Sequence, residues 1–307
     1  MKKVFIDGKA GTTGLRIEER LSERDDVVII SLPEELRKDT AARKEIINSA
    51  DIVFLCLPDD AAREAVSLIE NDNVTVIDAS TAHRTNPAWA YGFPELGEEF
   101  EKKIREGKRI AVPGCHASGF IALVAPLVKA GIIKKDARLS AHSITGYSGG
   151  GKKMIGEYEG EERDALLDAP RQYGITQMHK HLPEMKVICG LDHEPHFSPI
   201  VSDFYSGMEV TVPLFREDIN GTAEDIKRIY RELYQGGLIS YNDESEGGFL
   251  SAGAYSGRDS MAVGVYGNED RILLVARYDN LGKGASGAAV ECLNVKLGCE
   301  KTKTLVI

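Results

Sequence analysis

Long hydrophobic runs are absent from this sequence. No stretch approaches the roughly 18–20 consecutive apolar residues that a membrane-spanning helix requires, so no membrane association is predicted. Met1, Lys2 and Lys3 lead directly into a short β-branched segment, without the apolar core of a signal peptide. We therefore expect a cytoplasmic protein.

Cysteine is also scarce. The 307 residues include five cysteines, an odd number, and no CxxC pair. This count disfavours a disulfide framework and a zinc ribbon, and it fits free thiols in a reducing compartment. The scattered histidines and cysteines show no metal-ligand spacing, so no metal is predicted. Cys56 lies in an apolar run and is predicted to be a small core residue.

Positive charge is in deficit. The 38 lysines and arginines face 48 acidic residues, which gives a net charge of −10. Such a balance disfavours non-specific binding to nucleic acid or anionic membranes. The negative net charge does not exclude a small anionic ligand, because helix N-termini and local arginines can bind one. The length favours two domains of ordinary globular composition.

The first half of the chain alternates short β-branched runs with helical patterns. Strands are predicted at 4–7, 27–31, 52–57, 74–78 and 110–112, and helices at 13–23, 40–48 and 60–70. Alternating strands and helices indicate a Rossmann-type, doubly wound parallel sheet. The apolar strands lack alternation, as expected when both faces of the sheet are covered.

The second half has longer strand patterns. Strands are predicted at 137–145, 209–213, 261–266 and 272–278, an amphipathic helix at 222–235 and a final helix at 288–297. Gly267-Asn268 between the last two strands is a hairpin signal. These elements predict an α+β domain with a largely antiparallel sheet.

A glycine-rich turn follows the first predicted strand. Gly8, Gly11 and Gly14 have the spacing GxxGxxG, with Thr12 and Thr13 between the last two glycines. A strand, a glycine turn and a helix N-terminus together form a phosphate site, so these five residues are predicted to bind a dinucleotide. The spacing departs from GxGxxG, and a plain tight turn is the alternative.

The end of the second predicted strand bears on the choice of cofactor. Sites that prefer NAD usually carry an acidic residue there, to bind the ribose 2′-hydroxyl. Here Ser31 ends the strand, and Arg37 and Lys38 follow. A hydroxyl with nearby cations suits a 2′-phosphate, so NADP(H) is predicted, although Glu34 and Glu35 count against a basic pocket.

The segment 113–120 contains the strongest candidate for chemistry. Cys115 lies between a predicted strand and an apolar helix at 121–129, so it is expected at a helix N-terminus. The helix dipole and free N–H groups stabilise a thiolate there. Gly114 and Gly119 leave room for a substrate carbonyl. Cys115 is predicted to be a nucleophile, and a buried structural cysteine is the alternative.

A thiol nucleophile needs an acid/base partner. His179 and His181 flank a lysine, and in an extended segment their side chains would point to the same side. Leu182 precedes Pro183, which biases it toward extended geometry. His116 is adjacent to Cys115, but neighbouring side chains on a turn usually diverge. The residues alone leave the choice of partner open.

Five motifs occur in a fixed order, and together they carry a family resemblance. They are Gly8–Gly14, 78–84, 113–115, 179–184 and 279–287. Over essentially the whole chain they resemble the shorter form of the N-acetyl-gamma-glutamyl-phosphate reductases. The resemblance implies a dinucleotide-binding domain at 1–114, a substrate domain at 115–285 and a C-terminal helix, 286–307, that returns to the first domain. It also implies a homodimer or homotetramer.

The resemblance further implies a reaction and site residues. N-acetyl-L-glutamyl 5-phosphate, a small acyl phosphate, would be reduced by NADPH to the 5-semialdehyde through a Cys115 thioester, a step of arginine biosynthesis. His181 corresponds to the acid/base, with His179 as its close rival and otherwise a substrate ligand. The remaining residues matched to binding roles are Ser80, His83 and Arg84 for substrate and Gly282 for cofactor.

Two other functions share part of these features. Aspartate-semialdehyde dehydrogenases share the cofactor domain, the cysteine and the acyl-phosphate chemistry, but the segments 179–184 and 279–287 favour the N-acetylglutamyl enzymes. A non-catalytic Rossmann-fold sensor would require Cys115 to be structural. The sequence disfavours a sensor, because an inert protein has no use for a cysteine at a helix N-terminus.

Overall fold

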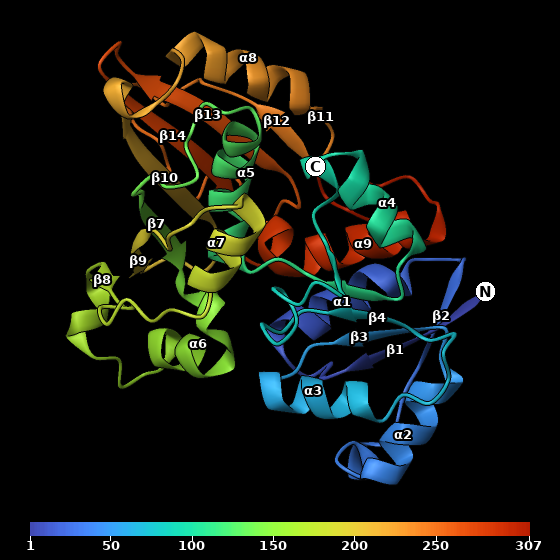
Figure 1. Cartoon of the computed structure of the whole chain (residues 1–307). Coiled ribbons are helices and arrows are strands. Elements are labelled where there is room, and N and C mark those ends of the chain that lie inside the picture. The colour runs from blue at the N-terminus through green and yellow to red at the C-terminus, as the bar shows by residue number, and fades with distance from the viewer. The chain divides into compact units, whose positions relative to one another are not determined.

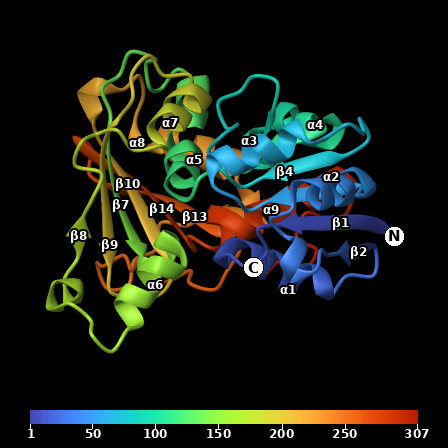
Figure 2. The same cartoon turned by 90° about the horizontal axis from the view of Figure 1, so that it is seen from below.

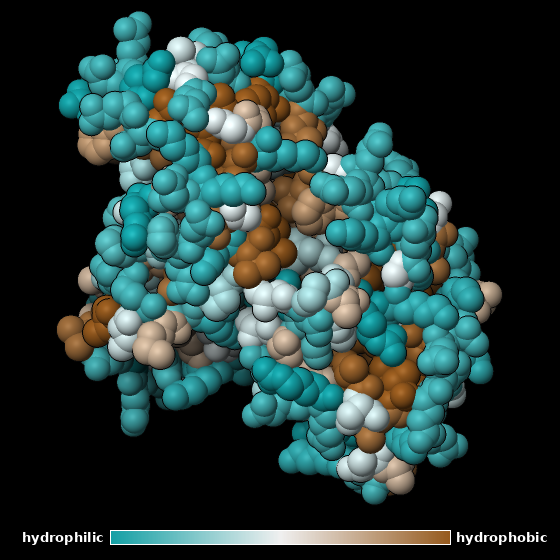
Figure 3. All heavy atoms as spheres, in the orientation of Figure 1, coloured by the Kyte–Doolittle hydropathy of each residue, from teal (hydrophilic) through white to brown (hydrophobic).

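The computed structural model describes all of residues 1–307, which group into two compact units. Unit 1 comprises Met1–Pro94, Glu98–Pro113 and Ala285–Leu305. Unit 2 comprises Glu95–Gly97, Gly114–Gly284 and Val306–Ile307. In the space-filling view, hydrophilic residues cover most of the visible face (Figure 3).

Unit 1 is built on a 6-stranded sheet of order β2-β1-β3-β4-β6-β5, and every pair of neighbouring strands is parallel. Its strands are β1 (Lys2–Asp7), β2 (Val27–Ile30), β3 (Ile52–Leu55), β4 (Thr75–Asp78), β5 (Ala90–Tyr91) and β6 (Arg109–Ala111). Its helices are α1 (Thr12–Ser22), α2 (Thr40–Ser49), α3 (Asp59–Ser67), α4 (Glu98–Glu106) and α9 (Gly287–Leu297).

Helices cover both faces of this sheet. In Figure 1, α2 and α3 lie below the sheet, and α1, α4 and α9 lie above it. Strand alternation divides the core accordingly: Val4 and Ile6 pack into the cluster that contains α9, whereas Phe5 packs into the cluster that contains residues of α2 and α3. The predicted doubly wound parallel sheet is confirmed.

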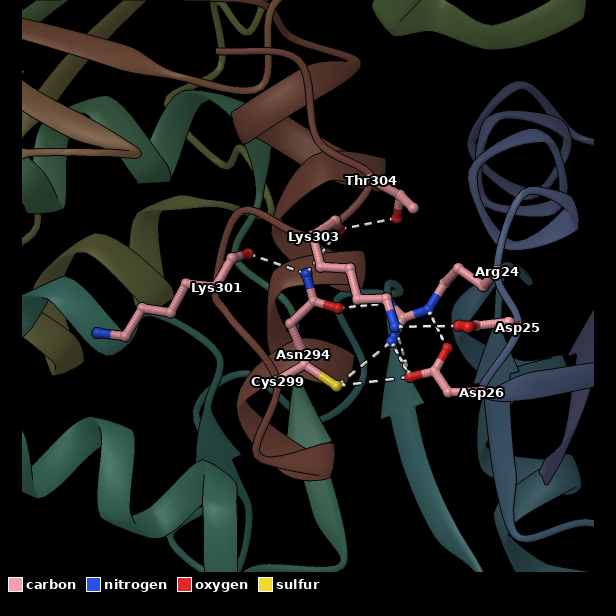
Figure 4. Close-up of polar contacts among 8 residues, drawn as sticks. All are labelled: Arg24, Asp25, Asp26, Asn294, Cys299, Lys301, Lys303 and Thr304. Atoms are coloured by element: carbon pink, nitrogen blue, oxygen red, sulfur yellow. Dashed lines mark hydrogen bonds and ion pairs between the residues drawn. The ribbon is translucent and has the colours of Figure 1, made fainter.

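The C-terminal segment folds with unit 1. Arg24, buried after α1, donates a hydrogen bond to the side-chain oxygen of Asn294 in α9. The amide of Asn294 in turn donates to the carbonyls of Lys301 and Lys303, each at 2.9 Å (Figure 4). Arg24 also pairs with Asp26 and holds the pKa of that carboxyl well below its usual range. These contacts fix the chain beyond α9 against the corner between α1 and β2.

Unit 2 is built on an 8-stranded sheet of order β11-β12-β13-β14-β10-β7-β9-β8. Its strands are β7 (Ser140–Gly146), β8 (Arg171–Gln172), β9 (His196–Ser202), β10 (Met208–Phe215), β11 (Gln235–Gly236), β12 (Ile239–Tyr241), β13 (Met261–Gly267) and β14 (Arg271–Tyr278). Its helices are α5 (Cys115–Lys129), α6 (Gly151–Glu159), α7 (Leu182–Cys189) and α8 (Ala223–Leu233). Neighbouring strands are antiparallel except in the pairs β7–β9 and β12–β13.

The helices of unit 2 pack on its sheet and on one another. Helix α5 contacts β14, β10 and α7, and α8 contacts β13 and β12 (Figure 2). A capping box starts α8, because Thr222 accepts the Asp225 N–H and Asp225 accepts the Thr222 N–H. The predicted hairpin joins β13 to β14, with Gly267 at φ +107°. The predicted α+β domain with a largely antiparallel sheet is therefore confirmed.

Two elements of unit 2 differ from the pattern expected from the sequence. Helix α7 begins at Leu182, where an extended segment was predicted, and β9 was not predicted at all. In β9, Pro199 interrupts the strand pattern because proline cannot donate to a sheet ladder. Proline is tolerated in the first turn of a helix, where its missing N–H would have no partner, so Pro183 does not prevent α7 from starting.

Candidate active site

The glycine turn of unit 1 is shaped for close backbone approach. Gly8 has φ +86°, and a Cβ there would lie 2.3 Å from the carbonyl oxygen of Cys56. A Cβ on Gly14 would lie 2.7 Å from the carbonyl oxygen of Gly8. Gly11 is the N-cap of α1 and places no side chain over the helix N-terminus. The turn thus fits a phosphate group bound by backbone N–H groups.

A cavity of about 410 Å³ opens next to this turn. Gly8, Ser31, Arg37 and Lys38 are among the residues that line it, together with apolar side chains of β1 and β2. Gly11, Thr12, Thr13 and Gly14 lie in the chain between Ala10 and Leu15, which both line the cavity. An adenosine moiety needs such a cavity beside the phosphate site, so the residues fit a dinucleotide.

The part of this cavity near Ser31, where the ribose 2′-group of a dinucleotide would lie, has side chains of both charges. Arg37 pairs with Glu34 at 2.7 Å, and both side chains are exposed. Lys38 adds a second cation, and the residue after β2 is Ser31, not an acid. Glu34 therefore offsets part of the positive charge but does not occupy the position that usually recognises a free 2′-hydroxyl.

The predicted substrate residues after β4 are tied to one another. The Ser80 hydroxyl donates to Asp78 at 2.8 Å, and the His83 Nδ1 lies 2.6 Å from the same carboxylate. The His83 ring also stacks on Trp89, with ring centroids 4.0 Å apart. Arg84 donates to the backbone carbonyls of Val112 and Ala79. The structure brings Ser80 and His83 together around a buried acid.

Cys115 is the first residue of α5, as the sequence predicted. Gly114 is the N-cap and carries no capping side chain. The Gly114 N–H instead donates at 2.8 Å to the carboxylate of Glu184, a buried residue in the first turn of α7. Glu184 thus joins the start of α7 to the start of α5. Glu184 is the last residue of the 179–184 motif, and nothing in the sequence pointed to this contact.

The two candidate histidines do lie together, but not for the predicted reason. Their ring centroids are 4.8 Å apart. His181 is the N-cap of α7 with helical backbone angles of φ −85° and ψ −14°, and Leu182 is the first residue of the helix. The Leu182 N–H donates to the carbonyl of His179 at 3.0 Å. The expectation of an extended segment is wrong: a turn, not strand alternation, gathers the rings.

His116 belongs to the same cluster, which the sequence did not predict. Its ring centroid lies 5.8 Å from that of His179 and 5.6 Å from that of His181. Its Nδ1 lies 2.6 Å from the Ser143 hydroxyl, and its Nε2 lies 2.5 Å from the Tyr173 hydroxyl. The sequence contained no signal for Ser143 or Tyr173, because Ser143 comes from β7 and Tyr173 from the residue after β8, both far from His116 in the sequence.

Burial sets the charge of two of these histidines, His116 and His179. Burial lowers the pKa of His116 to about 3, with a smaller contribution from His179. Burial, and then Lys180, lower the pKa of His179 to about 4. Both imidazoles are therefore neutral at pH 7, each with one donor and one acceptor nitrogen. Burial, and then the Cys115 thiol, raise the pKa of Tyr173, so its hydroxyl keeps its proton.

Gly282 has a packing explanation of its own. A Cβ at this position would lie 1.9 Å from the carbonyl oxygen of Arg258. It opens the π-helical turn Gly282–Ser286 that precedes α9. The close backbone contact accounts for the glycine, so a cofactor role for Gly282 rests on the family resemblance alone.

Comparison with known proteins identifies the family. Residues 3–104 match the model described as semialdehyde dehydrogenase, NAD binding domain, and residues 115–280 match semialdehyde dehydrogenase, dimerisation domain. The N-acetyl-gamma-glutamyl-phosphate reductase of Chelativorans sp. is 46% identical over 305 residues, covering 96% of this chain and 98% of the relative. That of Trichormus variabilis is 44% identical over 311 residues, covering 96% and 97%.

The chain belongs to the N-acetyl-gamma-glutamyl-phosphate reductase family. The resemblance inferred from the five motifs is thereby confirmed, as is the assignment to the oxidoreductases with a nicotinamide dinucleotide cofactor. None of the helices combines the length and apolar character needed to span a bilayer.

Solved structures agree on the fold. The aspartate semialdehyde dehydrogenase II of Vibrio cholerae superposes with a TM-score of 0.73 at 18% identity, covering 97% of this chain and 99% of that one. The aspartate semialdehyde dehydrogenase with NADP from Candida albicans gives a TM-score of 0.67 at 15% identity, covering 96% and 98%. At these identities the likeness shows a shared α/β architecture.

Proposed function

We propose that this enzyme reduces N-acetyl-L-glutamyl 5-phosphate to N-acetyl-L-glutamate 5-semialdehyde with NADPH, in the cytoplasm, as a step of arginine biosynthesis. The observation that carries the proposal is Cys115 at the first position of α5, with a cluster of histidines starting at the next residue. The full-length relatives with this name support the choice of substrate.

The first half of the reaction is acyl transfer to sulfur. The Cys115 thiolate attacks the acyl carbon and forms a C–S bond, while the carbonyl oxygen takes on negative charge. Backbone N–H groups in the first turn of α5, such as those of His116 and Ala117, are the candidate donors to this oxyanion. Collapse breaks the bond to phosphate, which leaves with the electron pair, and a thioester on Cys115 remains.

The second half is reduction. A dinucleotide held at the glycine turn of Gly8, Gly11 and Gly14 would provide the hydride that the thioester carbon accepts. We assign to His181 the proton exchange with the resulting tetrahedral oxyanion, and to His179 a contact with substrate. The neutral imidazole of His179 offers substrate one donor and one acceptor nitrogen. Cleavage of the C–S bond then releases the aldehyde and restores the thiolate.

Binding roles follow the same division. We propose that residues 1–114 form the dinucleotide-binding domain and that residues 115–285 form the substrate domain. Residues 286–307 form a C-terminal helix that returns to the dinucleotide-binding domain. Cofactor contacts are assigned to Gly8, Gly11, Thr12, Thr13, Gly14, Ser31, Arg37 and Gly282, and substrate contacts to Ser80, His83, Arg84 and His179. We further propose a homodimer or homotetramer, supported by the dimerisation domain that residues 115–280 match; light scattering of the purified protein tests it.

One set of rates tests the proposed reaction. The purified protein is offered N-acetylglutamyl phosphate or aspartyl phosphate, each with NADPH or NADH, or the two semialdehydes with phosphate and NADP in reverse. Turnover of the N-acetylglutamyl substrate with NADPH is expected to dominate. Preference for the aspartyl compound would make the chain an aspartate-semialdehyde dehydrogenase, and absence of turnover with all of them would favour a sensor.

A further inference from the structure

The hydroxyl of Tyr278, at the end of β14, enters the first turn of α5. It donates to the carbonyl oxygen of Cys115 at 2.5 Å and accepts the N–H of Gly119 at 2.9 Å. In a regular α-helix these two backbone groups, four residues apart, would bond directly to each other. The Tyr278 hydroxyl therefore contacts both partners of the hydrogen bond that closes the first turn of α5. Burial raises the pKa of Tyr278, so the bridging hydroxyl remains a donor.

Glycine at 119 makes room for this hydroxyl. A Cβ on Gly119 would lie 2.7 Å from the Tyr278 oxygen and 2.8 Å from its Cε1. It would also lie 2.7 Å from a methyl group of Val210, on the neighbouring strand β10. Any larger residue at 119 would therefore push the phenol away from the helix. Gly119 and Tyr278 form a matched pair, although 159 residues separate them.

The residues after Tyr278 also hold Cys115 in place. A Cβ on Gly284 would lie 3.1 Å from the Cβ of Cys115, so the Gly284 backbone packs directly on the cysteine. The Gly284 N–H donates to the carbonyl of Asp279 at 3.0 Å. The Asp279 carboxylate is fully buried and accepts hydrogen bonds from Ser206 and the Leu281 N–H. The turn at residues 279–284 thus packs against one side of Cys115, and Tyr278 donates a hydrogen bond to its carbonyl oxygen.

We propose that Tyr278 is a positioning residue that sets the backbone of Cys115 and so aims its thiol at the acyl carbon. The inference rests on the proposed role of Cys115 as nucleophile. Tyr278 acts through Cys115 and is not required to touch substrate. A displacement of about 1 Å at a reacting group can lower the rate by roughly a hundredfold, so small changes in this turn have large kinetic effects.

Tyr278→Phe removes the bridge without leaving two stranded polar groups. The Cys115 carbonyl and the Gly119 N–H are natural helix partners, so neither lacks a partner once the hydroxyl is gone. The protein is therefore expected to fold with a nearly unchanged melting temperature, but the Cys115 carbonyl loses the contact that holds it to β14. We expect kcat to fall about ten- to a hundredfold, with a much smaller change in KM.

Tyr230→Phe is the matched control. The Tyr230 hydroxyl is also buried and donates at 2.5 Å to a backbone carbonyl of α5, that of Leu123. It lies further along the helix from Cys115, so its loss should leave kcat unchanged. A purely structural role of buried tyrosine hydroxyls would make the two variants alike.

A second measurement reads the thiol directly. The rate at which iodoacetamide alkylates Cys115 is followed by mass spectrometry as a function of pH, in wild type, Tyr278→Phe, Gly119→Ala and Tyr230→Phe. The profile should change in the first two variants and not in the third. In Gly119→Ala the added methyl group pushes the Tyr278 hydroxyl away from α5, although the hydroxyl itself is still present. This variant therefore tests the same contact if Tyr278→Phe does not fold. Wild-type kcat and alkylation in a folded Tyr278→Phe or Gly119→Ala would overturn the inference.

Cys115→Ser separates the two proposals. If Cys115→Ser is inactive and Tyr278→Phe is fully active, the nucleophile assignment stands and the positioning role fails. If Cys115→Ser retains turnover, the proposed mechanism fails, whatever Tyr278 does to the alkylation profile.

Discussion

The hydroxyl of Tyr234 donates a hydrogen bond of 2.7 Å to the carbonyl oxygen of Ala122, in the middle of α5. Ala122 precedes Pro126 by four residues, and proline has no N–H with which to close that turn of the helix. The tyrosine supplies the missing donor from outside the helix. This contact explains how a buried helix that begins with the candidate nucleophile tolerates an internal proline.

Tyr234→Phe should therefore destabilise the protein. The Ala122 carbonyl would be left buried without its donor, which costs about 1–3 kcal/mol. Tyr230→Phe should cost less, because Leu127 still offers a helical N–H to the Leu123 carbonyl. Urea unfolding of the two variants measures the difference. An equal loss of stability in both would contradict the role assigned to Tyr234.

Cys115→Ser should abolish reduction while leaving the fold and NADPH binding intact. The substitution is nearly isosteric, but an alkoxide is scarce at neutral pH and its ester accepts hydride poorly. Steady-state assays and a fluorescence titration with NADPH provide the two readouts. Cys299→Ser is the control, because its hydroxyl can keep the contact that the thiol makes with Asp26. Substantial turnover in Cys115→Ser would remove the cysteine from the mechanism.

NADPH should be used better than NADH, and Ser31→Asp should reduce that preference. A carboxylate at the end of β2 would repel the 2′-phosphate and accept a hydrogen bond from a free 2′-hydroxyl. We expect the ratio of kcat/KM values to shift by about tenfold, which corresponds to about 1.4 kcal/mol. Ser31→Ala removes the hydroxyl without adding charge and should shift it less. A wild type that prefers NADH would disprove the assignment.

His181→Asn should lower kcat by about two to four orders of magnitude, the usual contribution of general acid–base catalysis. His179→Asn should mainly raise KM, because it removes a binding contact. Because the two rings are neighbours, steady-state kinetics of both variants are needed. The reverse pattern would exchange the two roles, and near-normal kinetics in both would return attention to His83 and His116.

Protonation of His116 should make the protein less stable in mild acid. Its folded-state pKa of about 3 lies below the unfolded value of 6.5, so the unfolded chain binds the proton first as pH falls. Its contribution is complete above pH 6.5 and is lost progressively below it. Between pH 7 and pH 5 the loss from this group is about 2 kcal/mol. Urea unfolding at both pH values should show a smaller difference in His116→Gln than in wild type.

The sequence by itself determined the parallel α/β unit, the glycine turn and the position of Cys115 at a helix start. These features depend on local patterns: apolar runs alternate with helices, three closely spaced glycines follow β1, and Cys115 follows Pro113 and Gly114 shortly after β6. The motif at 179–184 also singled out two histidines whose rings lie together, although its predicted backbone was wrong.

Tertiary structure alone decided what surrounds Cys115. His116 meets Ser143 and Tyr173, Gly114 meets Glu184, and Gly119 meets Tyr278 only because β7, β14 and α7 pack around α5. Partners that lie far apart in the sequence produce no periodic pattern from which their contact could be predicted. The pKa values near 3 and 4 at His116 and His179 likewise arise from burial, which depends on how the whole unit packs.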